Sequence, residues 1–133
     1  MDATPSAHAA AFWVGLHLIL LLVLSVLVVR QRRKHQVPLG DGGVPELAQA
    51  IRAFGNATEY VPTALIGLVA LAAVGAMPAL VHMAGATLFV GRLAHAWGLT
   101  RSGGPSTPRA VGVVATWLAY IVIGVSLLVY AIP

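Results

Sequence analysis

Four long apolar segments alternate with polar, turn-rich stretches along this chain. They cover approximately residues 9–34, 45–74, 79–99 and 109–131, and Pro and Gly gather in the connections between them. An apolar stretch of about 20 residues is long enough to cross the hydrocarbon core of a bilayer as a helix. The pattern therefore predicts one all-α membrane domain over residues 1–133, folded as a bundle of four transmembrane helices.

The first apolar segment could also be a cleaved signal peptide, and the order of its charges argues against this. Residues 9–29 carry no charge, and the basic cluster that begins at Arg30 follows the segment instead of preceding it. A signal peptide has its positive region in front of the apolar region. We therefore expect the first segment to be a retained transmembrane helix.

The composition agrees with a membrane protein. Hydrophobic residues make up 59% of the chain and charged residues only 9%, and the mean hydropathy is +0.88. Soluble domains carry about 25% charged residues. The chain has no cysteine, which excludes disulfides, cysteine nucleophiles and cysteine-ligated metal sites.

The distribution of basic residues predicts the topology. If the helices alternate in direction, the first and third connections lie on one side of the membrane. The eight basic residues all lie in or beside these two connections: Arg30, Arg32, Arg33, Lys34, Arg52, Arg92, Arg101 and Arg109. The positive-inside rule then places both basic loops in the cytoplasm and both termini outside. Because topology accounts for the net charge of +4, and no basic stripe is interleaved with aromatics, we expect no nucleic-acid partner.

The second segment carries a polar face at the start of its apolar run. Arg52, Asn56 and Glu59 are spaced i, i+4 and i+7, so a helix places them on one face, with Arg52 and Asn56 as local partners of Glu59. An ionisable residue in a bilayer-length segment is costly and indicates a functional site. The three side chains suit a ligand with an amine and carboxylates. The other interpretation is a polar cluster that packs helices and binds no ligand.

The third and fourth segments add further candidates near the same membrane level. Arg92 and His95 are spaced i and i+3, and His95 is either a hydrogen-bonded core histidine or a general base without an orienting carboxylate. Arg109 begins the fourth segment, where a cation opposes the helix dipole, which is a weak argument for an anionic partner. Simple positive-inside flanking is the interpretation that the sequence favours for this residue. Neither metal ligands at metal spacing nor a glycine-rich phosphate loop is present, so no metal site is expected.

These residues carry a resemblance to a known family. Residues 52–62, Arg-Ala-Phe-Gly-Asn-Ala-Thr-Glu-Tyr-Val-Pro, resemble the signature Arg-x-x-x-Asn-x-x-Glu-Tyr-x-Pro of the MAPEG superfamily, the membrane-associated proteins in eicosanoid and glutathione metabolism. Residues 91–95, Gly-Arg-Leu-Ala-His, are similar to a second stretch of that family. Residues 40–43, Gly-Asp-Gly-Gly, look most like its small bacterial branch.

The resemblance implies a homotrimer of four-helix protomers in a bacterial inner membrane. Glutathione would be the co-substrate, bound between protomers on the cytoplasmic side, and a lipophilic second substrate would enter from the bilayer. The residues implied in glutathione binding are Arg30, Arg52, Asn56, Glu59, Tyr60, Arg92 and His95. Arg109 aligns with the family arginine that stabilises the glutathione thiolate, and is the implied catalytic residue.

Four positions depart from the family pattern. Gly55 replaces a second arginine of some members, Leu99 a frequent tyrosine, and Ala110 and Val113 a serine and a tyrosine of the prostaglandin E synthase branch. Prostaglandin isomerase chemistry is therefore not expected. Two functions remain: a glutathione transferase with possible peroxidase activity, or a non-catalytic trimeric scaffold or thiol-binding protein. A small transporter fits less well, because polar residues do not line the full membrane depth.

Overall fold

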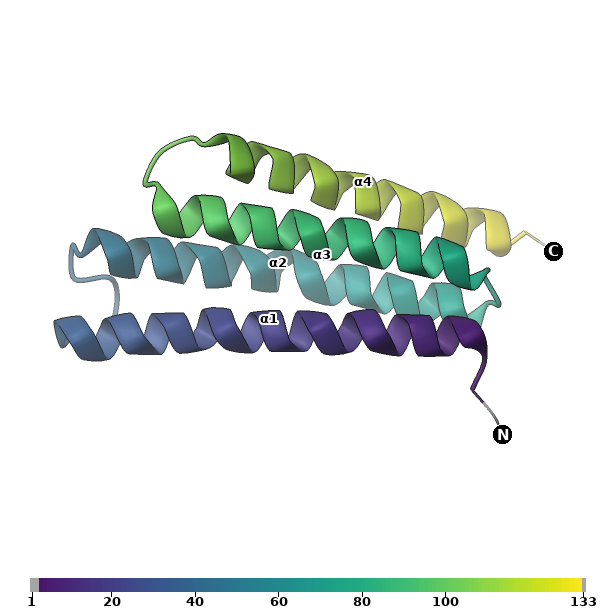
Figure 1. The fold of residues 1–133 in the computed structure, drawn as a ribbon, viewed down its shortest axis with the longest axis horizontal. Coiled ribbons are helices and arrows are strands. Elements are labelled where there is room, and N and C mark those ends of the chain that lie inside the picture. The colour runs from purple at the N-terminus through teal and green to yellow at the C-terminus, as the bar shows by residue number, and fades with distance from the viewer. Residues whose placement is uncertain (1–2, 133) are drawn as a thin grey trace.

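Four α-helices account for most of residues 3–132, the part of the chain that the computed structural model describes. Their bounds are α1 Pro5–His35, α2 Pro45–Ala73, α3 Pro78–Arg101 and α4 Thr107–Tyr130 (Figure 1). Every helix has a proline in its first two positions, where the missing N–H has no intrahelical partner to lose. The Thr4 side chain also caps α1 by accepting a hydrogen bond from the Ala7 N–H, which starts this helix before the apolar run.

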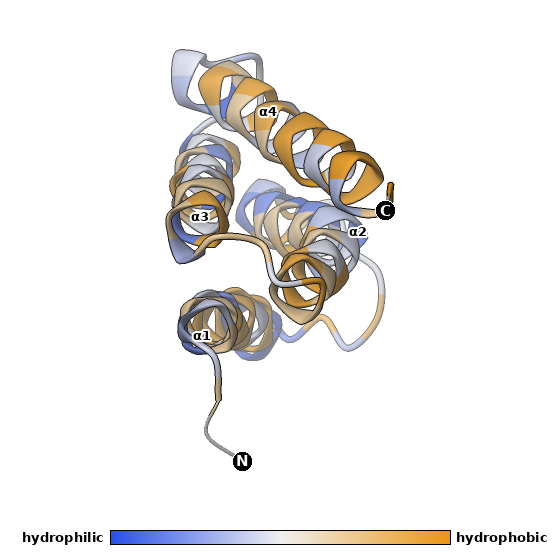
Figure 2. Ribbon diagram, turned by 90° about the vertical axis from the view of Figure 1, so that its right-hand side faces the viewer, coloured by the Kyte–Doolittle hydropathy of each residue, from blue (hydrophilic) through white to orange (hydrophobic). Residues whose placement is uncertain are grey.

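The helices form a bundle in which α2 and α3 lie between α1 and α4. Each outer helix packs against both inner ones, as the end-on view shows (Figure 2). The α1–α2 and α3–α4 connections lie at one end of the bundle, and the α2–α3 connection and both chain ends lie at the other (Figure 1). The two basic connections therefore share one end, which we name the basic end.

Three of the described helices are long and apolar enough to cross a membrane: α1, α2 and α4. The remaining helix, α3, has 24 residues and runs alongside the other three, but His82, Arg92 and His95 make it less apolar. Arg92 and His95 are buried by the neighbouring helices, so they are shielded from lipid. The crossing of the membrane by α3 stays a prediction, which this shielding supports.

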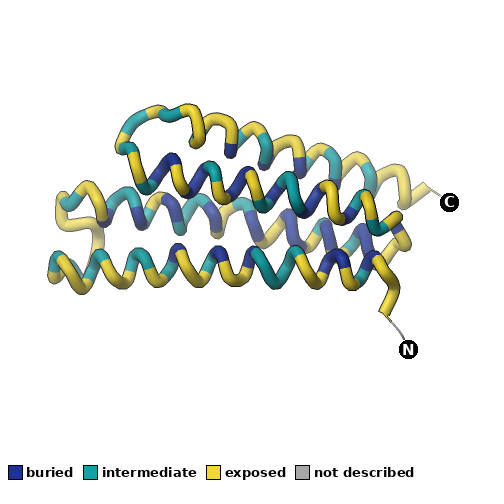
Figure 3. The backbone as a smooth tube through the Cα atoms, in the orientation of Figure 1, coloured by how far each residue is buried: buried dark blue, intermediate teal, exposed yellow. Residues whose placement is uncertain are grey.

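Exposed residues line the outer surface of every helix (Figure 3), and on each helix they include large apolar side chains. Ile19 on α1, Ile66 on α2, Val90 on α3 and Ile121 on α4 are each at least 60% exposed. Water-soluble proteins rarely expose contiguous apolar surface of this extent. The bundle therefore faces lipid or other protomers, while its helices satisfy their own backbone polar groups.

Close contact between α3 and α4 depends on glycine. A Cβ at Gly112 would lie 2.5 Å from the His95 N and 2.6 Å from the Gly91 O, and one at Gly98 would lie 2.7 Å from the Arg109 N. Such contacts with backbone atoms cannot be relieved by rotating a side chain. Small residues allow helices in membranes to approach closely, and here they bring the start of α4 onto the end of α3.

We expect Gly112→Ala to lower the thermal unfolding midpoint of the detergent-purified protein. The added methyl group overpacks the α3–α4 contact, which costs about 1–3 kcal/mol. Gly124→Ala is the matched control, because a Cβ at Gly124 on the same helix meets nothing within 4 Å. Equal midpoints for the two variants would show that the two helices do not pack as closely as described.

Candidate functional site

A buried arginine connects three helices in the basic half of the bundle. Arg92 on α3 is 2% exposed; its Nε donates to the Thr116 Oγ1 at 2.9 Å and its Nη1 donates to the Asn56 Oδ1 at 2.8 Å. Thr116 in turn donates to the Gly112 carbonyl on its own helix at 2.7 Å. A buried charge is tolerated only when it is hydrogen-bonded, and here neutral acceptors from α2 and α4 do this. We name Arg92, Asn56 and Thr116 the Arg92 network.

Tyr60 forms one wall of the Arg92 network. The Arg92 guanidinium lies 5.2 Å from the centroid of the Tyr60 ring, a cation–π distance. The Tyr60 ring meets Tyr120 edge-on, and the Tyr120 hydroxyl donates to the Tyr60 carbonyl at 2.6 Å. These contacts hold the middle of α2 against α4.

The Arg92 network fixes the orientation of the Asn56 amide. An arginine can only donate, so the oxygen of Asn56 must face Arg92. The two N–H donors of the amide are then left to meet another group. In this protomer Asn56 can therefore donate to an acceptor, such as a carboxylate or carbonyl oxygen. Arg92, which was expected to contact the ligand, can act on it through Asn56.

The sequence suggested that Arg52 and Asn56 would be the local partners of Glu59, and the structure arranges these residues differently. Asn56 bonds across the bundle to Arg92, while Arg52 and Glu59 are exposed on α2. Residues seven apart on a helix are separated by about 10 Å along its axis, too far for a direct ion pair between these two. Glu59 is the middle residue of α2 and is exposed on its outer surface, directly before the apolar second half of the helix.

A polar pocket of about 390 Å³ opens at the basic end, between α2, the end of α3 and the start of α4. It brings together two of the expected site residues, Arg52 and Arg109. The remaining lining residues are Pro45, Ala48, Gln49, Leu99, Ser102 and Gly103. Two guanidinium groups beside an amide and a hydroxyl form a site for an anionic ligand.

Arg109 takes its position from the packing of α4 on α3. The His95 Nδ1 lies 3.0 Å from the Arg109 carbonyl oxygen and donates to it, and Gly98 leaves room for the Arg109 backbone. His95, expected in the ligand site, is 4% exposed and acts in this protomer on the backbone that carries Arg109. Its role is therefore to position α4.

Arg109 also lines a second, apolar pocket of about 420 Å³ on the outer side of α4. The other lining residues are Pro105, Ser106, Ala110, Val113, Val114 and Trp117. Two of the departures from the family pattern, Ala110 and Val113, lie here and make this pocket more apolar, while Leu99 lies in the polar one. Arg109 thus lies between a pocket for charged groups and a pocket for an apolar molecule.

Of the eight expected site residues, only Arg52 and Arg109 line these pockets. Four others, Asn56, Tyr60, Arg92 and His95, make the buried contacts described above, and the last two lie on outer surfaces of the protomer. Arg30 is exposed on α1 and lines a groove along that helix, on the other outer flank of the bundle from α4. Glu59 lines neither of the pockets that contain Arg109. Both side chains can join a common site only if a neighbouring protomer or a ligand covers them.

Several residues of the site were not anticipated from the sequence. Thr116 and Tyr120 supply hydrogen bonds from α4, and Gln49 and Ser102 line the polar pocket. The available signal was the presence of hydroxyl groups inside an otherwise apolar fourth segment. Their spacing from Arg109 does not reveal which helix they face.

Comparison with known proteins identifies the family. Residues 10–129 match the MAPEG family. Two proteins described as inner membrane protein YecN, from Escherichia coli strains K12 and O6:H1 (CFT073), are each 39% identical over 110 residues, covering 83% of this chain and 82% of the relative. The match covers all four helices almost completely. The resemblance inferred from the helix-2 motif is confirmed, and this chain belongs to the MAPEG family.

Proposed function

We propose that this protein is a membrane-bound glutathione-dependent transferase that adds the glutathione thiolate to a lipophilic electrophile. The observation that carries the proposal is the place of Arg109, which lines both a polar, arginine-containing pocket and an apolar pocket open to the bilayer side of α4. A reaction between a charged tripeptide and an apolar substrate needs both surfaces around one reacting atom. Membership of a family named for glutathione and eicosanoid metabolism supports the same assignment.

The charges around the polar pocket suit glutathione. The tripeptide has two carboxylates and one amine. Arg52 in the polar pocket, and the N–H groups of Asn56 one turn further along α2, would provide donors for the carboxylates. Glu59 provides the carboxylate that the amine requires. Tyr60, one turn beyond Asn56 on α2, lies beside the Arg92 guanidinium of α3 and would complete this side of the site.

Arg109 is the catalytic residue in this proposal. A guanidinium beside the thiol favours its thiolate form, which is the nucleophile. The thiolate attacks the electrophilic atom, a C–S bond forms, and the displaced electron pair leaves with the leaving group or is protonated. A lipid hydroperoxide is the second class of electrophile: the thiolate attacks its terminal oxygen, an S–O bond forms, the O–O bond breaks and the lipid leaves as its alcohol after protonation. A second glutathione then displaces water from the resulting sulfenic acid and gives glutathione disulfide.

The proposal includes a homotrimer. Glu59 is a carboxylate on the outer surface at the middle of α2, and a charged group exposed to lipid at that depth is strongly unfavourable. A neighbouring protomer that supplies Arg30 from its α1 would cover Glu59 and complete the ligand site. This contact would place glutathione between protomers, as the family resemblance implies.

The first test is glutathione binding to the detergent-purified protein by calorimetry. We expect saturable binding that Glu59→Gln weakens about tenfold to a hundredfold, because a charge-assisted hydrogen bond contributes about 1.5–3 kcal/mol. Glu46→Gln is the control, since Glu46 is exposed in the first turn of the same helix.

Two outcomes would contradict this part of the proposal. One is the absence of binding at millimolar glutathione by a folded protein. The other is a Glu59→Gln variant that binds normally but no longer assembles, which would favour the non-catalytic scaffold in which these polar side chains only hold protomers together. Leu99 in the polar pocket, where many members have a tyrosine, is the observation that favours this second function.

The second test separates chemistry from binding. We expect Arg109→Ala to lower kcat for a lipophilic aryl halide about a hundredfold, with a smaller effect on glutathione affinity, because it removes the charge that stabilises the thiolate. Ultraviolet difference absorbance of the bound thiolate should fall in parallel. Arg101→Ala should keep its activity, since Arg101 is exposed and stacks 4.1 Å from the Trp97 ring centroid outside both pockets. Equal losses in the two variants would contradict a specific role for Arg109.

We further propose a bacterial inner-membrane location with the basic end in the cytoplasm and both termini outside. The chain contains no cysteine, so single cysteines report accessibility without background. In spheroplasts, an impermeant maleimide should label Met77→Cys in the α2–α3 connection. It should label Leu39→Cys in the α1–α2 connection only after permeabilisation, although both native side chains are exposed. The reverse pattern would invert the orientation.

A further inference from the structure

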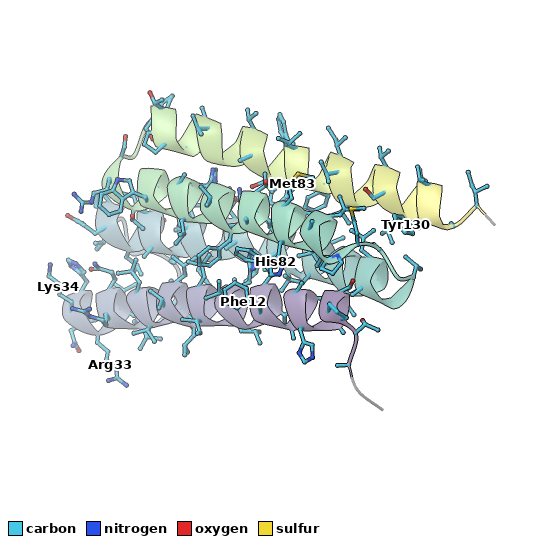
Figure 4. All side chains as sticks on the ribbon, turned by 45° about the vertical axis from the view of Figure 1, so that its right-hand side comes forward. Phe12, Arg33, Lys34, His82, Met83 and Tyr130 are labelled. Carbon is cyan, nitrogen blue, oxygen red and sulfur yellow. The ribbon has the colours of Figure 1, made fainter. Side chains whose placement is uncertain are left out.

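Two aromatic side chains of α1 meet a histidine of α3 near the end of the bundle opposite the basic end. The Trp13 indole Nε1–H donates to the His82 Nδ1 at 3.1 Å. Phe12 lies beside both residues, with its ring centroid 5.0 Å from that of Trp13 and 6.4 Å from that of His82 (Figure 4). His82 is exposed in the second turn of α3, so protons from the solvent can reach its ring.

The hydrogen bond between Trp13 and His82 requires a neutral histidine. The indole N–H can only donate, so the His82 Nδ1 carries no proton and its Nε2 carries one. An imidazolium has a proton on both nitrogens and therefore offers no acceptor. The indole also presents its N–H edge to His82, and the edge of an aromatic ring is its positive part. Protonation of His82 therefore removes the bond and replaces it with repulsion.

The indole of Trp13 lies directly against the backbone of α3. A Cβ at Gly85 would overlap the Trp13 ring, so this glycine leaves the space that the ring fills. Phe89, one turn further along α3, contacts the same ring at a centroid distance of 6.2 Å. Trp13 thus links the N-terminal half of α1 to α3, and its bond to His82 is the polar part of this contact.

A second histidine depends on the same helix contact. His17, one turn after Trp13 on α1, is fully buried; its Nδ1 donates to the Trp13 carbonyl oxygen at 2.7 Å, and its Nε2 is buried without a partner among the described residues. A charge on this ring would be uncompensated in the interior, so His17 stays neutral while the helices are packed. When α1 separates from α3, His17 can take up a proton as well, which favours the separated state in acid.

The other titratable groups in this half of the bundle do not compensate a charge on His82. His8 is exposed on α1, and the Tyr130 hydroxyl of α4 accepts a hydrogen bond from the Met77 N–H. Arg92, ten residues further along α3, is itself a cation. The helices contain no Asp, Glu, Lys or Arg over four stretches: residues 5–29, 60–73, 78–91 and 110–130. No carboxylate of these stretches is therefore available to stabilise an imidazolium at His82.

We infer that the Trp13–His82 hydrogen bond is a proton-sensitive contact that holds the N-terminal half of α1 against α3 at neutral pH and releases it in acid. The packed state binds fewer protons than the separated state. Its stability is therefore present above the pH range in which imidazoles titrate and is lost as the pH falls through that range. In the topology proposed above, this end faces the outside of the inner membrane, so the bundle would respond to external acid. The inference is independent of the glutathione site, because neither residue lines a pocket that contains Arg109.

The first measurement reads the hydrogen bond itself, by NMR of the detergent-solubilised full chain labelled with ¹⁵N-tryptophan. The chain has three tryptophans, so Trp97 and Trp117 are internal references. Between about pH 8 and pH 5, we expect the indole N–H signal of Trp13 to move upfield as its acceptor is lost, while the other two signals stay in place. His82→Asn is the matched variant, because an amide oxygen in the δ1 position accepts at any pH. It should keep the bond and abolish the movement.

The second measurement connects the bond to helix packing. We expect the thermal unfolding midpoint to fall between about pH 8 and pH 5, and to fall by about 4 °C more in the native chain than in His82→Asn. Trp13→Phe removes the donor and keeps an apolar ring, so it should lose the same part of the pH dependence. His8→Asn is the control, since His8 is exposed on the same helix, and it should behave as the native chain does.

Three outcomes would overturn the inference. One is a Trp13 signal that moves no further than those of Trp97 and Trp117. Another is an equal movement in His82→Asn, which would assign the titration to a different group. The third is an equal fall in the unfolding midpoint of the native chain, His82→Asn and Trp13→Phe, which would show that the bond breaks in acid without releasing α1.

Discussion

The interaction on which the rest of this bundle depends is the burial of the Arg92 guanidinium among neutral acceptors. A charge at this depth is costly, and removal of any partner leaves part of the cost uncompensated. Its acceptors come from two different helices, the Asn56 amide on α2 and the Thr116 hydroxyl on α4. The requirement to satisfy one side chain therefore fixes the relative register of three helices. It also fixes which atoms of Asn56 remain for a ligand.

The packing of α4 on α3 extends this constraint to the candidate catalytic arginine. Gly91 and Gly112 meet where Thr116 approaches Arg92, and Gly98 meets the Arg109 backbone nearer the basic end. The same close approach that allows the Arg92 network to form thus sets where α4 begins. Because Arg109 follows directly from that start, it lies at the boundary between the polar and apolar pockets. Stability and the position of the site share one set of contacts.

The hydropathy and charge patterns of the sequence predicted the helices and the end of the bundle where the basic connections lie. Most of the contacts that they did not predict are contacts between helices. Runs of apolar residues indicated the helices, and the basic residues indicated that two connections share one end, because both signals are local in sequence. The partner of Asn56 was not predictable, since Arg92 is 36 positions away and spacing along one helix favours local pairs. Composition alone also underestimates how well α3 suits a membrane-spanning position, because Arg92 and His95 count as polar although neighbouring helices cover them.

One protomer leaves part of the candidate site exposed on its outer surfaces. The polar pocket gathers Arg52 and Arg109, but Glu59 and Arg30 remain on outer surfaces of α2 and α1. A carboxylate that faces lipid within a membrane-spanning helix is costly unless another group covers it. Under the proposed function, the neighbouring protomer and glutathione cover Glu59 together, so assembly and ligand binding favour each other by linkage. The exposure of Glu59 and Arg30 in one protomer then follows from a ligand site that is divided between two protomers.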